Sequence, residues 1–594
     1  MAYMNKILRV DLTSGKITDE KLDEQTAKMF IGGRGLGAKI ISDEVDPKTD
    51  PLSAANKIVF TTGPLTGTKA PTSGRFSASF KSPLTNTLTD CHAGGHFGPW
   101  LKWAGYDALI IQGKADEHVY LSISDETVEL FDASEVWGKN TSETDDILRK
   151  KHDGKVICIG PAGEKQSLIS SIMVNAGRAL GRGGIGAVLG SKQLKAIVAS
   201  GSQKIAIQND GFDRAVFEAT ALLKEKAVTG ESLPSRGTTV LVHVINMNGM
   251  YPVKNFQESQ WPFDKAELTS GERIRDEFFS GRQGCYGCPI VCGHKIKLED
   301  GREFKSPEFE TVWSFGADMD NTDFATIAEA GALCDQYGLD TISAGATIAA
   351  AMELEEMGKI NEGLKWGDCE AILQAVHMMG KGKGFGEELA KGSKVLCEKY
   401  GAPEVSMTVK GMEMPAYDPR GAKGMGLAYA TSNRGGCHLR AYMVSPEVLG
   451  TPKEMLDRFS TDGKARWTID FQDISAFVDS LVLCRFTQFS LGIDNYAEMY
   501  AAATGMDFDA ADLMKAGARI YNIERMYNLS AGLSKEDDTL PDRLLNARVT
   551  AGPSRGQTVK LKGMRKEYYD LRGWSKEGVP EAWRLKEYGL DGGE

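Results

Sequence analysis

Hydrophobic positions divide the chain into an early part that predicts strands and later parts that predict helices. Up to about residue 205, short apolar or alternating runs stand between Gly- and Pro-containing stretches, which is typical of strands. These runs are residues 7–12, 57–62, 75–80, 108–111, 119–123, 156–159 and 196–199. From about residue 210 to 410, apolar residues recur at three- and four-residue spacing and predict helices at 213–227, 324–337, 343–357 and 366–380. Gly338 and Gly358 are candidate C-caps.

The last part of the chain mixes glycine-rich stretches with helices. Residues 421–426 are rich in glycine, and residues 471–486 predict an amphipathic helix that carries Cys484. The tail from about residue 551 is charged and contains proline, so we expect it to wrap the surface. We find no internal repeat at a solenoid period. The whole pattern therefore predicts a β-rich part followed by mainly helical parts.

Three glycine-rich stretches, residues 32–37, 93–95 and 181–186, are expected to form tight turns between the early strands. The last contains Arg182 and matches G-x-G-x-x-G, the pattern of dinucleotide-binding folds. Only residues 187–194 separate it from the next strand, which is too few for the crossover helix, so we reject a dinucleotide fold. Such a turn can hold an anionic group through backbone N–H donors, or it can simply join two strands.

Composition narrows the class of protein. The chain has 594 residues, a net charge of −11, 41% hydrophobic and 25% charged residues, as expected for a globular protein with several domains. It lacks the Lys/Arg-rich runs of nucleic-acid-binding proteins and any apolar run long enough to span a membrane. The first residues predict a strand rather than a signal peptide. The ten cysteines are widely spread, which favours reduced thiols in a cytoplasmic protein over a disulfide scaffold.

Cys285, Cys288 and Cys292 form a Cys-x2-Cys-x3-Cys motif. A loop with this spacing can direct three thiolates to one point, where they bind a soft metal or an iron–sulfur cluster. A [4Fe–4S] cluster needs a fourth ligand from elsewhere in the chain, whereas His294 would complete a Cys3His zinc site. Plain buried cysteines are the third interpretation, and the spacing leaves all three open.

Two segments share a second pattern. Residues 335–340 read D-x-x-G-L-D and residues 479–484 read D-x-x-V-L-C. An aspartate at the end of a helix can accept hydrogen bonds from the N–H groups of a fused heterocycle, although such a residue is more often a cap or a surface group. The pattern alone therefore identifies candidate residues and leaves their role open.

The order of five motifs resembles that of the tungsten-dependent aldehyde:ferredoxin oxidoreductases. The motifs are the cysteine motif, residues 307–310 (P-E-F-E), the first aspartate motif, residues 434–438 (R-G-G-C-H) and the second aspartate motif. The early glycine-rich stretches are also similar, so the resemblance covers nearly the whole chain. It implies an α+β multidomain fold. A β-rich cofactor-base domain would span residues 1–208, and mainly helical domains would span residues 209–412 and 413–594.

The resemblance also implies a tungsten bis-pyranopterin cofactor, a [4Fe–4S] cluster and a Mg2+ ion that bridges the pterin phosphates. The implied cluster ligands are Cys285, Cys288, Cys292 and Cys484. The implied cofactor-binding positions are Arg75, His92, Gly94, Gly95, Arg182, Gly183, Asp335, Leu339, Asp340, Arg440, Asp479 and Leu483. This sequence departs from the family pattern at two places: Val482 replaces a glycine, and His92 stands where related chains often carry Asn beside the Mg2+.

Glu310 and His438 match the family's proposed catalytic pair. Oxidation of an aldehyde to an acid uses water as the nucleophile, so a carboxylate near the metal can take a proton from that water. An imidazole can hydrogen-bond the carbonyl oxygen, and the metal can accept two electrons that then leave singly through the cluster. Outside this set of motifs, Glu310 would be interpreted as a helix N-terminal acid and His438 as an ordinary loop histidine.

The implied partners are an aldehyde and either ferredoxin or iron–sulfur and flavin subunits. We expect an oligomer, and neither a nucleic-acid nor a membrane partner. Glu329 falls where some relatives supply a ligand to a metal that bridges subunits. Its candidate partner is His377, but Gln374 stands where a glutamate would be needed. We therefore expect this interface metal to be absent or altered.

The favoured function is oxidation of aldehydes to carboxylic acids, with acid reduction as its reverse. A second candidate is the catalytic subunit of a tungsten-dependent benzoyl-CoA reductase. Glu310 and the absence of a cysteine between Cys292 and Cys334 count against that alternative. A third candidate is a zinc-stabilised binding protein without redox activity.

Overall fold

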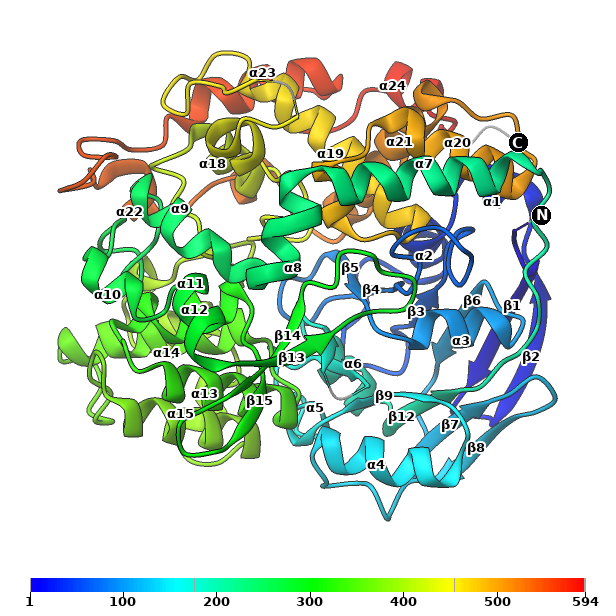
Figure 1. Ribbon diagram of the computed structural model, residues 1–594, viewed down its shortest axis with the longest axis horizontal. Helices are drawn as coiled ribbons and strands as arrows, with labels where there is room; N and C mark the ends of the chain where they lie inside the picture. The colour runs from blue at the N-terminus through cyan, green and yellow to red at the C-terminus, as the bar shows by residue number, and fades with distance from the viewer. Residues whose placement is uncertain (1, 176, 453, 592–594) are drawn as a thin grey trace.

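Two six-stranded β-sheets form the early part of the chain in the computed structural model, which describes residues 2–175, 177–452 and 454–591 (Figure 1). In spatial order, the first sheet is β2 (Lys16–Lys21), β1 (Lys6–Asp11), β6 (Ala108–Gln112), β3 (Ile58–Thr61), β4 (Phe76–Lys81) and β5 (Leu88–Ala93). The second is β11 (Arg178–Leu180), β10 (Ile172–Val174), β9 (Lys155–Ile159), β12 (Leu194–Ala199), β7 (Val119–Ile123) and β8 (Val128–Asp132). The β-rich start is confirmed.

The two sheets share one apolar core. Phe60 and Phe76 of the first sheet lie in the same buried cluster as Leu121 and Ile197 of the second. Within each sheet one neighbouring pair is parallel, β1–β6 or β7–β12, and the other pairs are antiparallel. A dinucleotide-binding fold needs a mainly parallel sheet with crossover helices. The rejection of that fold is therefore consistent with the topology and with the short helix after Gly184.

Short helices connect these strands. The stretch 32–37 was expected to be a turn, and this expectation is wrong, because residues 33–44 form a helix. Its glycines permit close packing: a Cβ atom at Gly33 would lie 2.3 Å from the carbonyl oxygen of Asp479, and one at Gly37 would lie 2.2 Å from Oγ of Ser79. The helices are α1 (Glu24–Phe30), α2 (Gly33–Glu44), α3 (Phe97–Trp103), α4 (Thr141–Lys151), α5 (Pro161–Glu164) and α6 (Ile185–Ser191).

The middle of the chain is mainly helical, as predicted. Its helices are α7 (Gly211–Glu225), α8 (Leu233–Arg236), α9 (Leu241–Met247), α10 (Phe263–Glu267), α11 (Gly271–Arg273), α12 (Phe309–Phe315), α13 (Phe324–Tyr337), α14 (Thr341–Glu356), α15 (Cys369–Lys381), α16 (Gly386–Leu389) and α17 (Ser393–Lys399). Short strands are β13 (Phe279–Gln283), β14 (Gly293–Lys297), β15 (Glu303–Lys305), β16 (Thr408–Val409) and β17 (Met412–Glu413). The four helices predicted here are confirmed within a few residues, and Gly338 caps α13 in the left-handed conformation.

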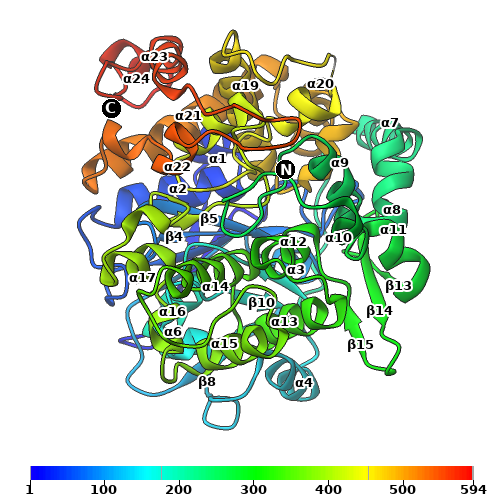
Figure 2. The same cartoon turned by 90° about the vertical axis from the view of Figure 1, so that its left-hand side faces the viewer.

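The C-terminal helices return to the N-terminal part (Figures 1 and 2). They are α18 (Lys423–Ala430), α19 (Lys464–Leu481), α20 (Ile493–Thr504), α21 (Ala510–Ser530), α22 (Asp542–Asn546), α23 (Leu561–Arg572) and α24 (Ala582–Glu587). Helices α19 and α21 pack on α2 through a shared core that contains Leu36, Ala476 and Ile520. The helix predicted at 471–486 is partly wrong, since α19 ends at Leu481 and Cys484 lies beyond it.

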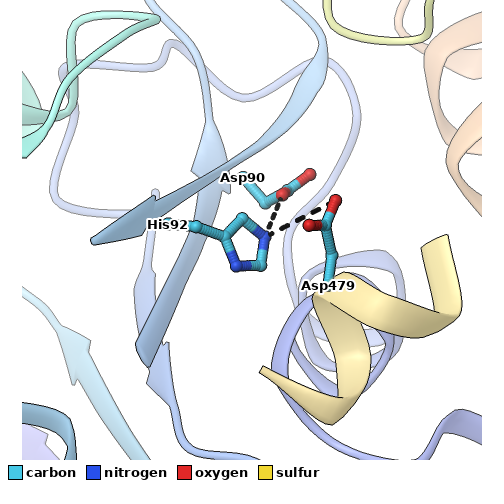
Figure 3. A group of neighbouring side chains, drawn as sticks. All are labelled: Asp90, His92 and Asp479. Carbon is cyan, nitrogen blue, oxygen red and sulfur yellow. Dashed lines mark hydrogen bonds and ion pairs between the residues drawn. The ribbon is translucent and has the colours of Figure 1, made fainter. Parts of the chain in front are cut away.

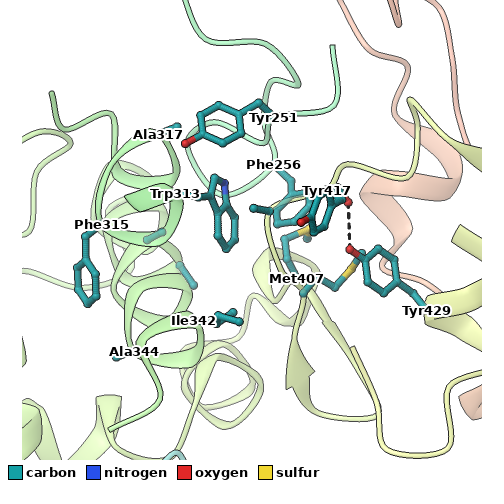
Figure 4. Packing of buried hydrophobic residues seen from close by; sticks show 14 of the residues in the cluster. Tyr251, Phe256, Trp313, Phe315, Ala317, Ile342, Ala344, Met407, Tyr417 and Tyr429 are labelled. Atoms are coloured by element: carbon teal, nitrogen blue, oxygen red, sulfur yellow. Dashed lines mark hydrogen bonds between the residues drawn. The ribbon is translucent and has the colours of Figure 1, made fainter. Parts of the chain in front are cut away.

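The largest apolar cluster lies in the helical part (Figure 4). It joins α12 and α14 to the chain between residues 407 and 430, with Trp313, Ile342 and Tyr429 among its buried members. Among the helices of the described residues, none combines the length and apolarity that crossing a membrane requires. The α+β class is confirmed, and the division into three domains stays a prediction.

Candidate active site

Four cysteine thiols from distant parts of the chain line one cavity of about 190 Å³. Cys285, Cys288 and Cys292 lie on the loop between β13 and β14, and Cys484 follows α19. Each cysteine in the described part of the chain is a free thiol. A set of thiolates around one space is what an iron–sulfur cluster needs. The fold thus brings together the four residues that the resemblance implies as cluster ligands.

His294 does not line this cavity. Its Nε2 atom lies 3.0 Å from the carbonyl oxygen of Pro234, and its ring meets Phe279 edge to face. The side chain is therefore engaged elsewhere. The geometry does not support the Cys3His zinc site, because Cys484 takes the fourth place around the cavity.

Two of the residues expected at the pterin belong to the lining of the cavity that the four cysteines form. Arg75 and Gly94 both line it. A Cβ atom at Gly94 would lie 2.7 Å from Sγ of Cys285, so glycine is needed for the cysteine to approach. The guanidinium of Arg75 donates to the backbone carbonyl of His92 at 3.3 Å. Gly95 has a positive φ of 100° and turns the chain next to this contact.

Arg178 and Glu308 also line the cavity. Glu308 belongs to the P-E-F-E motif without a role assigned to it, and Arg178 was not singled out. Arg178 donates to Glu308 at 3.1 Å and to the carbonyl oxygen of Gln283 at 3.3 Å. A Cβ atom at Gly293 would lie 2.3 Å from Arg178 Nη2, so this glycine makes room for the guanidinium. A cation beside four thiolates stabilises their negative charge.

A buried charge network lies where β5 meets the end of α19 (Figure 3). Nε2 of His92 lies 2.8 Å from Asp90 and 4.0 Å from Asp479. These three side chains are close enough to one another to be considered as metal ligands. His92 and Asp479 come from positions expected to bind the pterin, whereas Asp90 was missed.

Guanidinium groups already neutralise these carboxylates. Arg440 donates to Asp90 at 2.5 Å and to Asp479 at 3.2 Å, and Arg34 lies 3.6 Å and 3.4 Å from the same two residues. Burial opposes ionisation of Asp90, but Arg440 and Arg34 outweigh it and hold its pKa well below the usual range. Such a set repels a divalent cation, so this trio does not fit Mg2+.

Arg182 ties the β-rich part to the helical part. Its side chain donates to Asp340 at 2.9 Å and to the carbonyl oxygens of Gly436 at 2.8 Å and Glu413 at 2.7 Å. Asp340 is also the N-cap of α14. Gly183 has a positive φ of 83° and directs the turn that carries Arg182. Two expected cofactor-binding residues, Arg182 and Asp340, therefore contact each other.

Asp335 stands apart from the other expected residues. Its carboxylate pairs with Lys305 at 2.9 Å and is partly exposed, whereas Asp479 lies in the buried network. Leu339 and Leu483 are both buried. The two similar sequence motifs therefore have different surroundings in this structure.

Glu310 and His438 face each other and are mostly buried. His438 Nε2 lies 3.6 Å from Glu310 Oε1, and their side chains are 13% and 15% exposed. Glu310 lies in the first turn of α12, and its other oxygen accepts from the backbone N–H of Ala416 at 3.0 Å. Glu310 Oε1 and His438 Nδ1 are buried without a hydrogen-bond partner. Buried atoms of this kind need a ligand or ordered water.

Burial shifts both groups toward their neutral forms. It raises the pKa of Glu310 to about 8, against the opposing Ala416 N–H and the charge of Arg182. It lowers the pKa of His438 well below the usual range, helped by the guanidinium groups of Arg182 and Arg434. His438 is therefore neutral at physiological pH, and Glu310 can exchange a proton there.

The candidate interface-metal residues have partners within the chain. Glu329 accepts from Arg302, and His377 Nδ1 lies 2.8 Å from the hydroxyl of Tyr337. Gln374 donates to Glu370 at 3.0 Å. The expectation that the interface metal is absent or altered stays a prediction.

Other buried polar atoms near the charge network also lack partners, and they suit an anionic cofactor. Ser77 lies opposite His92 and Ser79 opposite Asp90 in the β4–β5 pairing. The unpartnered atoms are Oγ of Ser77 and Ser79, Nε of Arg434 and Arg440, and Nη1 of Arg485. Hydroxyl and guanidinium donors are well suited to phosphate oxygens. The residues present therefore fit a phosphorylated pterin.

Comparison with known proteins agrees with this arrangement. The family description "Aldehyde ferredoxin oxidoreductase, N-terminal domain" matches residues 7–201, and "Aldehyde ferredoxin oxidoreductase, domains 2 & 3" matches residues 214–590. The chain is 47% identical to the tungsten-containing aldehyde ferredoxin oxidoreductase of Pyrococcus furiosus over 98% of both chains. It is 46% identical to that of Pyrococcus abyssi over 99% of both chains.

A solved structure has a similar fold: the active site complex BamBC of benzoyl coenzyme A reductase with 1,5-dienoyl-CoA. The TM-score is 0.87 at 25% identity, covering 99% of this chain and 97% of the other. The family models together match most of the chain, and the relatives with the same family name are far more similar in sequence than this structure. The resemblance inferred from the motifs is confirmed, and the chain belongs to the aldehyde ferredoxin oxidoreductase family.

Proposed function

We propose that this chain oxidises aldehydes to carboxylic acids, with water as the oxygen source. The observation that carries the proposal is the buried pair of Glu310 and His438, each of which has a buried polar atom without a hydrogen-bond partner. The names of the relatives, which are tungsten-containing aldehyde ferredoxin oxidoreductases, support it.

The proposed cofactors are a tungsten bis-pyranopterin, held by Arg182, Asp340, Arg440, Asp479 and neighbouring donors, and a [4Fe–4S] cluster on the four thiols. When bound, the tungsten centre would supply a two-electron acceptor that polarises oxygen. Mg2+ at the pterin phosphates remains a proposal from the resemblance, since the trio of Asp90, His92 and Asp479 does not suit it.

In this proposal Glu310 acts as the general base. Its carboxylate takes a proton from water as the water attacks the carbonyl carbon. His438 is neutral and can donate a hydrogen bond to the carbonyl oxygen, which stabilises the negative charge that develops there. Burial of both side chains strengthens these interactions by excluding bulk water.

A [4Fe–4S] cluster held by the four thiols would supply one-electron transfer, and Arg75, which is expected on the pterin side, lines the same cavity. We propose ferredoxin, or an iron–sulfur partner subunit, as the acceptor, in line with the relatives' names. The cytoplasmic location and the oligomeric state expected from the sequence are part of this proposal.

Activity of the anaerobic holoenzyme with an aldehyde panel and a viologen acceptor tests the function. We expect Glu310→Gln to lower kcat by about 10²- to 10⁴-fold and His438→Ala by about 10²-fold, with unchanged cofactor content. In the wild-type protein kcat/KM should rise with pH up to about 8, because only ionised Glu310 accepts a proton.

Two variants serve as controls. Glu447 is also buried with a raised pKa but pairs with Lys464, so Glu447→Gln should keep the activity. His377 contacts Tyr337 and neither Glu310 nor His438, so His377→Ala should do the same. Full activity of Glu310→Gln would rule out the proposed base.

Benzoyl-CoA reduction is the second candidate, and the fold similarity to BamBC favours it. Reduction of benzoyl-CoA by the same preparation, without aldehyde oxidation, would select this alternative. The identity of 25%, against 47% to the aldehyde oxidoreductase, favours aldehyde chemistry.

A further inference from the structure

Aldehyde oxidation releases protons inside a site that has little contact with solvent. One aldehyde and one water give one carboxylic acid, two protons and two electrons. A C–O bond forms, the aldehyde C–H bond and a water O–H bond break, and the two electrons pass singly to two equivalents of oxidised ferredoxin or viologen. Glu310 Oε1 is buried, so a proton collected there needs a route out. The inference rests on the proposed function, because it takes Glu310 as the base that collects a proton during aldehyde oxidation.

Tyr251 carries an unused hydroxyl, and its ring packs on the residue that precedes this base. The residue is fully buried, and its hydroxyl has no hydrogen-bond partner. Its ring lies 5.8 Å from that of Phe309, which directly precedes Glu310. Burial raises the pKa of Tyr251, and the nearby carboxylates of Glu310 and Asp318 raise it further. The hydroxyl therefore lies within the field of two acidic groups, one of which is the proposed base.

The chain around Tyr251 connects these two acidic groups. Trp313 of α12 donates to the carbonyl oxygen of Pro252 at 2.9 Å. Three residues further on, the backbone N–H of Asn255 donates to the carboxylate of Asp318 at 3.1 Å. Figure 4 shows Tyr251 beside Trp313, with its hydroxyl on the side of Ala317, the residue before Asp318. Residues 251–255 thus run from the start of α12, where Tyr251 packs on Phe309, to η4 (Ala317–Met319).

Asp318 has the properties of a proton carrier. It is fully buried, and its Oδ2 atom has no partner. Burial raises its pKa well above the usual range, and the charge of Glu353 adds to this. A buried carboxyl with a raised pKa holds its proton to higher pH than an exposed one and can give it up and regain it.

Beyond Asp318, a polar chain leads to the surface. The amide of Asn255 donates to Glu353 at 2.7 Å, and Glu353 pairs with Arg543. The side chain of Arg543 is 17% exposed. This pair is the point at which the buried groups reach solvent.

We propose that Tyr251 and Asp318 form the proton-release route from Glu310 to the Glu353–Arg543 pair, with ordered waters between them. Glu310, Tyr251 and Asp318 each carry a buried oxygen without a partner, and both carboxylates act electrostatically on the Tyr251 hydroxyl. Buried polar atoms are normally satisfied by protein or water, so waters between these groups account for all three. Tyr251 and Asp318 thus carry protons, and Glu310 remains the base.

Hydrogen–deuterium exchange of the Glu310 carboxyl group tests the route without requiring turnover. Below its pKa of about 8 this group is protonated, and its infrared C=O band is identified by its loss in Glu310→Gln. In the wild-type holoenzyme the band should shift within the mixing time after transfer to D2O. We expect Tyr251→Phe and Asp318→Asn to slow this shift by about tenfold or more.

Two variants control for the loss of a buried polar atom. Tyr527 on α21 and Asp145 on α4 each carry a buried oxygen without a partner, but neither lies on the route. Tyr527→Phe and Asp145→Asn should leave the exchange unchanged. Equal exchange rates in the wild type, Tyr251→Phe and Asp318→Asn would overturn the route.

Turnover separates failure of the route from failure of the function. With an aldehyde and benzyl viologen, both route variants should show a kcat about ten- to a hundredfold lower, a larger solvent isotope effect and an unchanged KM. Wild-type protein that does not oxidise aldehydes, yet shows slowed exchange in the variants, would refute the function and keep the route. Normal exchange in both variants refutes the route whatever the activity.

Discussion

At the scale of single residues, burial determines what Glu310 and His438 can do. An exposed glutamate would be ionised at neutral pH, but burial raises the pKa of Glu310 to about 8. The same burial keeps His438 neutral, so it can act as a hydrogen-bond donor without carrying a charge. Glu310 must therefore lose its proton before it can act as a base. His438 can donate a hydrogen bond in its neutral form.

The raised pKa of Glu310 should make its effect on stability depend on pH. The usual pKa is 4.5 and the pKa in the folded protein is about 8, so the folded state binds this proton more tightly. The stabilising contribution is complete below pH 4.5 and is lost as the pH rises to about 8. Gln cannot ionise, so the melting temperature of Glu310→Gln relative to wild type should rise between pH 4.5 and about 8.

Thermal melts of both proteins with matched metal content measure this difference. A constant offset between the two proteins across that pH range would mean that Glu310 has an ordinary pKa. A difference that grows with pH would agree with a base held at a cost in stability.

At the scale of elements, a buried ion pair joins α2 to α21. Arg34 donates to both carboxylate oxygens of Glu524, at 2.6 Å and 2.7 Å, and the two residues are 0% and 2% exposed. Asn433 adds a hydrogen bond to Glu524 at 3.0 Å. The glycines of α2 allow this close approach, which explains why a stretch that looked like a turn is a helix.

Removal of one member of this pair should be costly. Arg34→Met leaves Glu524 buried without its main partner, and we expect a loss of about 3–5 kcal/mol in the free energy of unfolding. Lys69→Met removes an exposed pair with Asp213 and should cost less than about 1 kcal/mol. Urea unfolding midpoints of the two variants measure the difference. Equal midpoints would show that the α2–α21 contact depends on apolar packing alone.

At the scale of the whole molecule, the site forms where distant parts of the chain meet. β5 supplies His92, α12 supplies Glu310, and the chain after α19 supplies Cys484. Arg182 spans this junction and holds Asp340 from the helical part. The fold is therefore needed in full for the site to exist.

Regular periodicity made α13, α14 and the early strands predictable, since it reports on burial along one element. The cluster ligands and the pair Glu310–His438 were predictable only because several motifs occur together. Tyr251 and Arg34 were missed because their roles depend on contacts between residues far apart in the sequence. The end of α19 was also misplaced, since Val482 stops the helix in a left-handed conformation that a β-branched residue rarely adopts.

The metal content of the anaerobically purified protein tests directly whether the chain is an oxidoreductase that depends on tungsten and an iron–sulfur cluster. Iron, tungsten and zinc are quantified per chain, with Cys484→Ala as the matched variant. We predict about four irons and one tungsten per wild-type chain, and a loss of iron in Cys484→Ala. Zinc alone, with neither iron nor tungsten, would contradict a tungsten- and cluster-dependent oxidoreductase.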